Sequence, residues 1–335
     1  MKKMNINKLV ILASLLSVFV SCGNDDDLDD VRTGGKSVVT IDQTSVSVTE
    51  GDDITFTLTI DKPSNRDIDY KIELVGGTGS FRDYTSSGEE TTIGEGGYGQ
   101  GTIGHKLVFP AYSTTATFTI TPTKDLLVEG SETLEIWLRS SGNGLGLVDE
   151  ASSKITINVA DYISNDIGLR LDWAQSTTDI HGTIEEGTYA TSAGADAGHF
   201  TDYDFDFYVF DSGFVDVTAS AAATGASPEL AEILNADIPD GIYSVYVDLY
   251  DSGPTPLSPF QHDLKLTISK YGVWTTTVQI PTSSNDVFSD FVVDIEKTGS
   301  TYTVKDYYTT DLIISGKNSN FTKKQLVKSK LRQRK

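Results

Sequence analysis

The sequence contains a single cysteine, Cys22, so no disulfide bond can form within the chain. Any fold must therefore be held together by its hydrophobic core or by bound metal. Basic side chains are also scarce, since 26 Lys and Arg stand against 48 Asp and Glu and the formal net charge is −22. A chain this acidic is repelled by phosphate backbones, which argues against nucleic acid as a partner.

Long apolar runs are scarce as well. The N-terminal apolar run, 9–20, has 12 residues and follows three lysines, so it is too short for a comfortable membrane span. The pattern predicts a signal peptide over residues 1–21. Cys22 stands where bacterial lipoproteins carry their lipidated residue, so we expect lipidation of Cys22 and anchoring in the membrane through the lipid.

An acidic segment follows the predicted lipidation site. Residues 22–36 include the run Asp25–Asp30 and offer almost nothing to bury, which predicts a solvated tether. The run resembles the acidic signal that follows the lipidated cysteine in surface lipoproteins of Bacteroidetes. That resemblance implies an outer-membrane lipoprotein exposed at the cell surface.

No catalytic constellation is recognisable in the sequence. Neither the Gly-x-Ser-x-Gly nor the His-Glu-x-x-His pattern occurs. His181, His199 and His262 are scattered over segments that read as loops, and no two carboxylates are marked as a glycosidase pair. We therefore expect a protein without enzymatic activity.

The first half of the chain has the pattern of a β-sandwich. Apolar and polar residues alternate strictly in Thr55–Ile60, Ala116–Thr121, Leu134–Leu138 and Lys154–Val159. Period-two alternation in repeated short segments is typical of antiparallel sheets with one buried face. Residues 37–163 are therefore predicted to form an all-β sandwich.

The order of short motifs in this region resembles a Calx-beta domain. In chain order the motifs are Val46–Asp52, Asp83-Tyr84, Leu107–Pro110, Thr117–Ile120, Asp125–Glu132 and Ile155–Asp161. The acidic element Asp125–Glu132 is the most specific of them. The resemblance covers residues 38–162 and implies an immunoglobulin-like sandwich, a fold in which several members bind Ca²⁺ between loops at one end.

The resemblance implies five ligands for Ca²⁺, namely Glu50, Asp83, Asp125, Glu129 and Asp161. Hairpin loops need polar residues, but crowded carboxylates repel one another unless a cation lies among them. Lys124 stands where calcium-binding members carry an acid, so we expect its ammonium group to compete with the ion and the site to be weak. The alternative is that these acids only solubilise loops and cap turns.

Residues 164–316 are predicted to form a second, jelly-roll-like β-sandwich. In one of its strands aspartates alternate with aromatic residues, which places Asp202, Asp204 and Asp206 on the same face. Like charges on alternate residues are unfavourable unless they face solvent or share a cation, so the three aspartates define a second candidate acidic site. A single short helix is expected at Pro228–Leu234.

The C-terminal segment has the opposite charge to the rest of the chain. Residues 317–335 contain eight Lys or Arg and no acid. Because the segment lacks a regular apolar stripe, its composition predicts a disordered basic tail. The alternative is a tail that docks on acidic polymer or on the chain's own acidic surface.

These features predict a non-enzymatic cell-surface lipoprotein that acts as a calcium-stiffened binding or adhesion module for a surface protein or polysaccharide. The alternative function is a glycan-binding accessory lipoprotein of a polysaccharide uptake system. A glycan site needs aromatic side chains exposed in a row. For that alternative the candidates are Trp274 with Tyr271, and Tyr98 in a glycine-rich loop.

The anchor prediction can be tested by substituting Cys22→Ala. We expect the variant to leave the membrane fraction, because lipidation then has no acceptor thiol. Fractionation of washed membranes followed by immunoblotting measures the effect. Retention of the variant in washed membranes would contradict the lipoprotein prediction.

Overall fold

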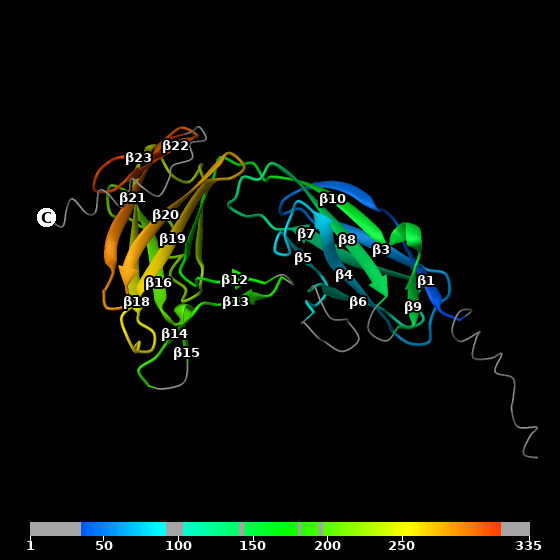
Figure 1. Cartoon of the computed structure of the whole chain (residues 1–335). Helices are drawn as coiled ribbons and strands as arrows, with labels where there is room; N and C mark the ends of the chain where they lie inside the picture. Colours follow the sequence, from blue (N-terminus) through cyan, green and yellow to red (C-terminus); the bar gives the residue numbers. More distant parts are fainter. Residues whose placement is uncertain (1–34, 92–102, 141–143, 180–181, 194–196, 316–335) are drawn as a thin grey trace, which may run out of the picture.

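The computed structural model describes residues 35–91, 103–140, 144–179, 182–193 and 197–315. Strands dominate this part of the chain, and the all-β prediction is confirmed (Figure 1). Among the described residues, no helix has the length and apolar character needed to cross a membrane. Cys22, Tyr98, His181 and the tail 317–335 lie outside the described residues.

The first sandwich consists of two five-stranded sheets. One has the order β5-β7-β3-β1-β9 and the other the order β2-β10-β8-β4-β6. The strands of the first sheet are β1 (Ser37–Ile41), β3 (Ile54–Ile60), β5 (Tyr84–Ser86), β7 (Thr115–Pro122) and β9 (Gly146–Val148). Those of the second are β2 (Ser45–Thr49), β4 (Ile68–Gly77), β6 (His105–Phe109), β8 (Ser131–Ser140) and β10 (Lys154–Ala160), with the short 3-10 helix η2 (Glu150–Ser152) before β10.

Inward-facing and outward-facing residues alternate along the strands, which explains how these two sheets share a core. In β3, Ile54, Phe56, Leu58 and Ile60 point inward and are at most 5% exposed. Phe56 stacks on Phe118 of the neighbouring strand β7, with ring centroids 5.1 Å apart. One hydrophobic cluster joins residues of both sheets, as expected for sheets packed face to face.

The second sandwich is also built from two main sheets. One is four-stranded with the order β17-β11-β19-β20, and the other is five-stranded with the order β16-β18-β21-β22-β23. The first contains β11 (Ile167–Asp172), β17 (Glu229–Ile233), β19 (Gln261–Lys270) and β20 (Trp274–Ser283). The second contains β16 (Asp204–Phe210), β18 (Gly241–Asp251), β21 (Ser289–Thr298), β22 (Thr301–Asp306) and β23 (Leu312–Ser315).

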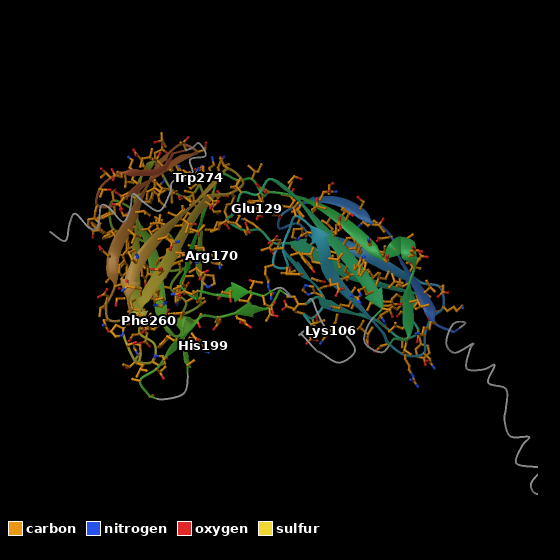
Figure 2. The ribbon with its side chains drawn as sticks, in the orientation of Figure 1. Lys106, Glu129, Arg170, His199, Phe260 and Trp274 are labelled. Atoms are coloured by element: carbon orange, nitrogen blue, oxygen red, sulfur yellow. The ribbon has the colours of Figure 1, made fainter. Side chains whose placement is uncertain are left out.

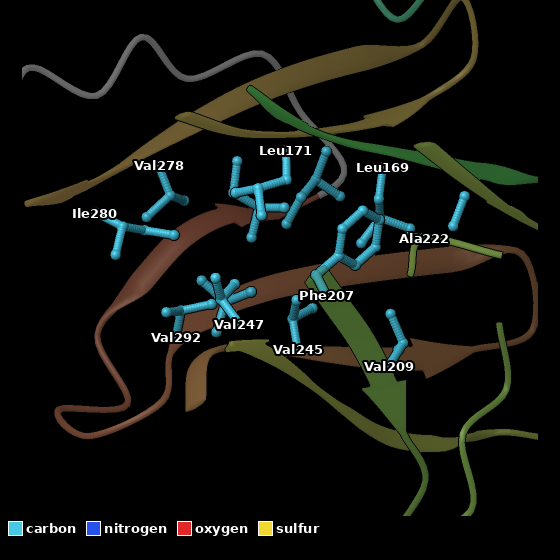
Figure 3. Close-up of a cluster of buried hydrophobic side chains, with 14 of the residues drawn as sticks. Leu169, Leu171, Phe207, Val209, Ala222, Val245, Val247, Val278, Ile280 and Val292 are labelled. Atoms are coloured by element: carbon cyan, nitrogen blue, oxygen red, sulfur yellow. The ribbon is translucent and has the colours of Figure 1, made fainter. Parts of the chain in front are cut away.

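Four short strands form two small ribbons beside these sheets. They are β12 (Thr177–Thr178) with β13 (Ile184–Glu185), and β14 (Thr188–Ala190) with β15 (Ala197–His199), which is followed by the 3-10 helix η3 (Phe200–Asp202). Between the main sheets, aliphatic side chains and Phe207 interdigitate (Figure 3). Trp173 is buried there, and its Nε1 donates to the carbonyl oxygen of Tyr203 at 2.8 Å.

The helix expected at Pro228–Leu234 is a strand instead. Glu229–Ile233 forms β17, which pairs antiparallel with β11 and alternates between buried and exposed residues. The local sequence favours a helix, but pairing with β11 and burial of Ala231 and Ile233 outweigh that propensity.

Within the described parts of the chain, the two sandwiches touch at two places. Lys124 Nζ of the first sandwich lies 2.8 Å from Glu232 Oε1 of β17. At the second place the turn between β12 and β13 reaches the first sandwich, where Arg82 Nη2 donates to the carbonyl oxygen of Gly182 at 2.9 Å. That residues 37–163 and 164–316 fold independently stays a prediction.

His262 is the most completely buried histidine among the described residues, at 1% exposure. Its ring packs among four aromatic rings with centroids 4.9 to 5.6 Å away, those of Phe200, Tyr203, Phe205 and Phe260. Its Nε2 lies 3.3 Å from the carbonyl oxygen of Trp173. Burial disfavours the imidazolium ion and lowers the pKa of His262 to about 4.

This burial makes the stability of the second sandwich sensitive to acid. The pKa of His262 is about 4 in the folded state, against the ordinary value of 6.5. The folded state is therefore most stable above pH 6.5, and its free energy of unfolding decreases as the pH drops toward 4, because the unfolded state then binds the proton more readily. The full decrease in the free energy of unfolding is about 3 kcal/mol. We expect His262→Phe to remove this part of the pH dependence in denaturant unfolding curves recorded between pH 4 and 7. An unchanged slope in His262→Phe would contradict the burial of a neutral imidazole.

Candidate metal centre

Three connecting segments bring acidic residues to one end of the first sandwich. Glu50 follows β2, Asp125 and Glu129 lie in the segment between β7 and β8, and Asp161 follows β10. Backbone hydrogen bonds hold the segments together, since the Glu50 amide donates to the Ala160 carbonyl at 3.0 Å and the Gly51 amide to the Pro122 carbonyl at 2.8 Å. The ends of β2, β7 and β10 are thereby fixed side by side.

A glycine shapes the turn that follows Glu129. Gly130 has a φ of +82°, a conformation that residues with a Cβ adopt only under strain. In this conformation its amide donates to Asp161 Oδ2 at 3.1 Å, which ties the turn to the end of β10. The position of Glu129 therefore depends on both the glycine and Asp161.

The resulting centre consists of Glu50, Asp125 and Glu129. One carboxylate oxygen from each lies within 4.8 Å of the other two. Glu50 is buried, Asp125 is half-buried and Glu129 is exposed, so the group opens from the protein toward solvent. Glu129 lies on the side of the first sandwich that faces the second (Figure 2). Carboxylate oxygens without sulfur or imidazole ligands match the preferences of a hard cation.

The electrostatics of the centre favour a bound cation or a bound proton. Burial raises the pKa of Glu50 to about 7, and the charges of Asp125, Asp161 and Glu132 add to this effect. The pKa of Glu129 is also raised to about 7, first by partial desolvation of its carboxyl group, although the side chain as a whole is exposed, and then by the charges of Glu132 and Asp125. Burial raises the pKa of Asp125 as well. Such shifts mark carboxylates whose negative charges are poorly compensated.

Asp83 and Asp161, the other two predicted ligands, lie near the centre but have partners of their own. The Asp83 carboxylate accepts hydrogen bonds from the amide and the hydroxyl of Ser80, and Asp161 accepts from Gly130. Their charges nonetheless raise the pKa of Asp125. Glu132, absent from the predicted ligand set, contributes in the same way to Glu50 and Glu129. The sequence signal that could have indicated Glu132 is the spacing Glu-Gly-x-Glu, which begins at Glu129.

The expected competition from Lys124 is contradicted by the structure. Its ammonium group pairs with Glu232 and lies 4.2 Å from the ring centroids of both Tyr162 and Tyr271. An opposite charge and two aromatic faces stabilise it there, at the boundary between the sandwiches. The ammonium therefore does not occupy the place of a cation among the carboxylates.

The second acidic group differs in one member from the predicted set. Asp204, Asp206 and Glu229 each offer an oxygen within 4.8 Å of the others. Asp202 is not part of it, because its carboxylate accepts from the His199 amide at 2.8 Å and caps η3. The sequence could not indicate Glu229, since the residue was expected on a helix and reaches the group only through β17.

Two of the three aromatic residues predicted for glycan binding, Trp274 and Tyr271, are not available at the surface, and the third, Tyr98, lies outside the described residues. Trp274 is 1% exposed and belongs to the core of the second sandwich. Tyr271 is 7% exposed, and its ring contacts Tyr162 with centroids 5.6 Å apart. Trp274 with Tyr271 therefore cannot form an exposed platform.

Comparisons with known proteins return structural similarity only. No protein-family model and no curated protein matches the sequence. Among solved structures, the apo form of the Calx CBD1 domain is 16% identical and covers 37% of this chain and 96% of its own, with a TM-score of 0.28. The CBD12 structure from CALX1.2 is 12% identical and covers 63% of this chain and 78% of its own, with a TM-score of 0.27.

A third similar structure is a chaperone–tip adhesin complex of CFA/I fimbriae. It is 10% identical, covers 73% of this chain and 99% of its own, and has a TM-score of 0.23. All three scores are below 0.5, so the fold rests on the strands described above and on none of these likenesses. The neighbours include calcium-binding and adhesin-related β-domains.

The raised pKa values give the centre a testable pH dependence in the absence of metal. With folded pKa values of about 7 against an ordinary 4.5, Glu50 and Glu129 favour folding most below pH 4.5, and this advantage disappears as the pH rises through 7. In EDTA, we expect melting of the first sandwich to occur at a lower temperature at pH 8 than at pH 5. Glu50→Gln should reduce the difference. If the melting temperatures at pH 5 and pH 8 differ as much in Glu50→Gln as in the wild type, the raised pKa of Glu50 is not the cause of the difference.

Proposed function

We propose that this protein is a non-enzymatic, lipid-anchored module of the cell surface whose first sandwich binds Ca²⁺ through Glu50, Asp125 and Glu129. The observation that carries the proposal is the convergence of these three carboxylates, since one oxygen from each lies within 4.8 Å of the others. Like charges at this separation repel, and a divalent cation removes the repulsion.

The donor set favours Ca²⁺ over other common cations. Transition metals prefer imidazole or thiolate ligands, and the group contains neither. Mg²⁺ requires a near-regular octahedron at short distances, whereas Ca²⁺ accepts irregular oxygen ligands at longer ones. Asp83, Asp161 and Glu132 lie close enough to add negative charge or complete the coordination through water. Weak binding, typical of extracellular modules, is the expectation.

The location of the centre supports a mechanical role for the ion. The segment that carries Asp125 and Glu129 also carries Lys124, which pairs with Glu232, and Leu126, whose side chain packs against Gly168 of β11. An ion that fixes this segment would therefore stiffen the junction between the sandwiches. A stiff, extended module on a lipid anchor is suited to binding or adhesion at a distance from the membrane.

Two further parts of the proposal rest on the sequence. The lipid anchor at Cys22 and the acidic run after it support a position on the outer face of the outer membrane, and the absence of catalytic motifs supports a binding role. The alternative, a glycan-binding accessory lipoprotein of a polysaccharide uptake system, keeps the same location and differs in the ligand.

Calcium binding should raise the melting temperature of the first sandwich. Binding to the folded state alone stabilises by about 1.4 kcal/mol at ten times Kd, which is enough for a shift of several degrees. We expect this shift with Ca²⁺ and a much smaller one with Mg²⁺ in scanning calorimetry. Glu129→Gln should weaken it, whereas Glu150→Gln, an exposed residue of η2 outside the centre, should leave it unchanged.

Two results would contradict the proposal. One is a melting curve that does not change at about 10 mM Ca²⁺, roughly ten times the upper end of the Kd range of extracellular calcium modules. The other is an equal calcium shift in wild type and Glu129→Gln, which would place the ion elsewhere in the chain.

A further inference from the structure

Six aromatic side chains form a continuous series on the second sandwich. Ring centroids of successive members are 4.8 to 6.3 Å apart. We call this series the aromatic stripe, and its members are Tyr208 and Phe210 of β16, Tyr246 of β18, Phe291 of β21, and Tyr307 and Tyr308 after β22. The stripe therefore crosses the strands of the five-stranded sheet and does not run along one of them.

The strand pattern places the stripe on the outer face of this sheet. In β16 the core-facing residues Phe205, Phe207 and Val209 are at most 1% exposed, and Tyr208 and Phe210 alternate with them. Cross-strand register continues the series, since Tyr208 pairs with Tyr246. All six rings are partly exposed, and Tyr308 reaches 50%. The outer face of an antiparallel sheet is ordinarily polar, so a row of rings there marks an interaction surface.

Hydroxyl and carboxyl groups lie beside the rings. The hydroxyl of Tyr208 donates to Asp206 Oδ2 at 3.2 Å, and that of Tyr308 donates to Asp290. Ser244 Oγ, on the strand of Tyr246, donates to Asp294 Oδ1 at 2.6 Å. Asp206 is buried at 5% exposure, whereas Asp290 and Asp294 are partly exposed. The surface thus combines apolar ring faces with the carboxylates of Asp290 and Asp294 as hydrogen-bond acceptors.

Charge decides which class of partner fits. The carboxylates beside the stripe and the net charge of −22 repel anionic polymers and a second copy of this chain. A peptide added as a strand needs a sheet edge, whereas the stripe lies on a sheet face. The carboxylates beside the stripe already accept hydrogen bonds from neighbouring hydroxyls, which is the contact that the hydroxyl of a sugar would make.

We propose that the aromatic stripe binds a neutral polysaccharide. A sugar ring presents C–H groups on its face and hydroxyls around its rim. The faces can stack on the rings of the stripe, and the rim hydroxyls can donate to the flanking carboxylates. Successive sugar rings of one chain then contact successive aromatic rings across the sheet.

This inference names the ligand class of the binding module proposed above, and it rests on that proposal only for the module's role. The stripe and the calcium centre share no residue and belong to different sandwiches. Polysaccharide binding is therefore expected in EDTA as well as in Ca²⁺, and failure of the calcium proposal leaves the inference intact.

Affinity electrophoresis of the full chain without its signal peptide tests the inference. Native gels would contain amylopectin, galactomannan, xyloglucan or β-1,3-glucan, with polygalacturonate as an anionic comparison. We expect retardation by at least one neutral polymer and none by polygalacturonate. Tyr208→Ala and Tyr308→Ala should each weaken it about tenfold, as loss of one well-formed aromatic contact implies.

Two controls separate stacking from other effects. Tyr308→Phe keeps the ring and should keep most of the binding, and Tyr112→Ala removes an exposed tyrosine of the first sandwich and should change nothing. Unchanged melting temperatures of the variants show that the fold is kept.

Absence of retardation by every neutral polymer overturns the inference, as does retardation that survives both alanine substitutions. Binding of a synthetic peptide of residues 317–335 in place of any sugar also overturns it.

Discussion

Three carboxylates at one end of the first sandwich are held closer together than their charges favour. The backbone brings them together, because pairing with the end of β10 fixes the main chain at Glu50 and the turn at Gly130 fixes the main chain beside Glu129. Burial first, and the charges of neighbouring carboxylates second, raise the pKa values of Glu50 and Glu129. A proton or a cation relieves the repulsion, and Ca²⁺ is the cation that we propose because it accepts irregular carboxylate oxygens.

The same end of the sandwich forms the junction with the second domain. Lys124 lies one residue before Asp125 and extends between Tyr162 of the connecting segment and Tyr271 of the second sandwich. The segment of Asp125 and Glu129 therefore contributes to both the metal centre and the contact between domains. The acidic centre and the contact therefore lie on the same segment, which is why an ion bound there is proposed to stiffen the junction.

Local patterns in the sequence were sufficient for the strands and for much of the acidic centre. Alternation predicted β3 and β10, and the acidic spacing drew attention to Asp125 and Glu129. Three features depend on long-range contacts and could not be predicted. The partner of Lys124 lies 108 residues away, Glu229 is positioned by a strand whose residues favour a helix, and the aromatic stripe exists only because separate strands align in the sheet.

The most direct test of the metal centre is a crystal structure of the chain without its signal peptide, grown with Ca²⁺ and measured at a wavelength where calcium scatters anomalously. We expect one anomalous peak with oxygens of Glu50, Asp125 and Glu129 about 2.3 to 2.6 Å from it. A structure without a peak there, in which the three carboxylates turn away from one another toward solvent, would contradict the proposal that their repulsion is relieved by an ion.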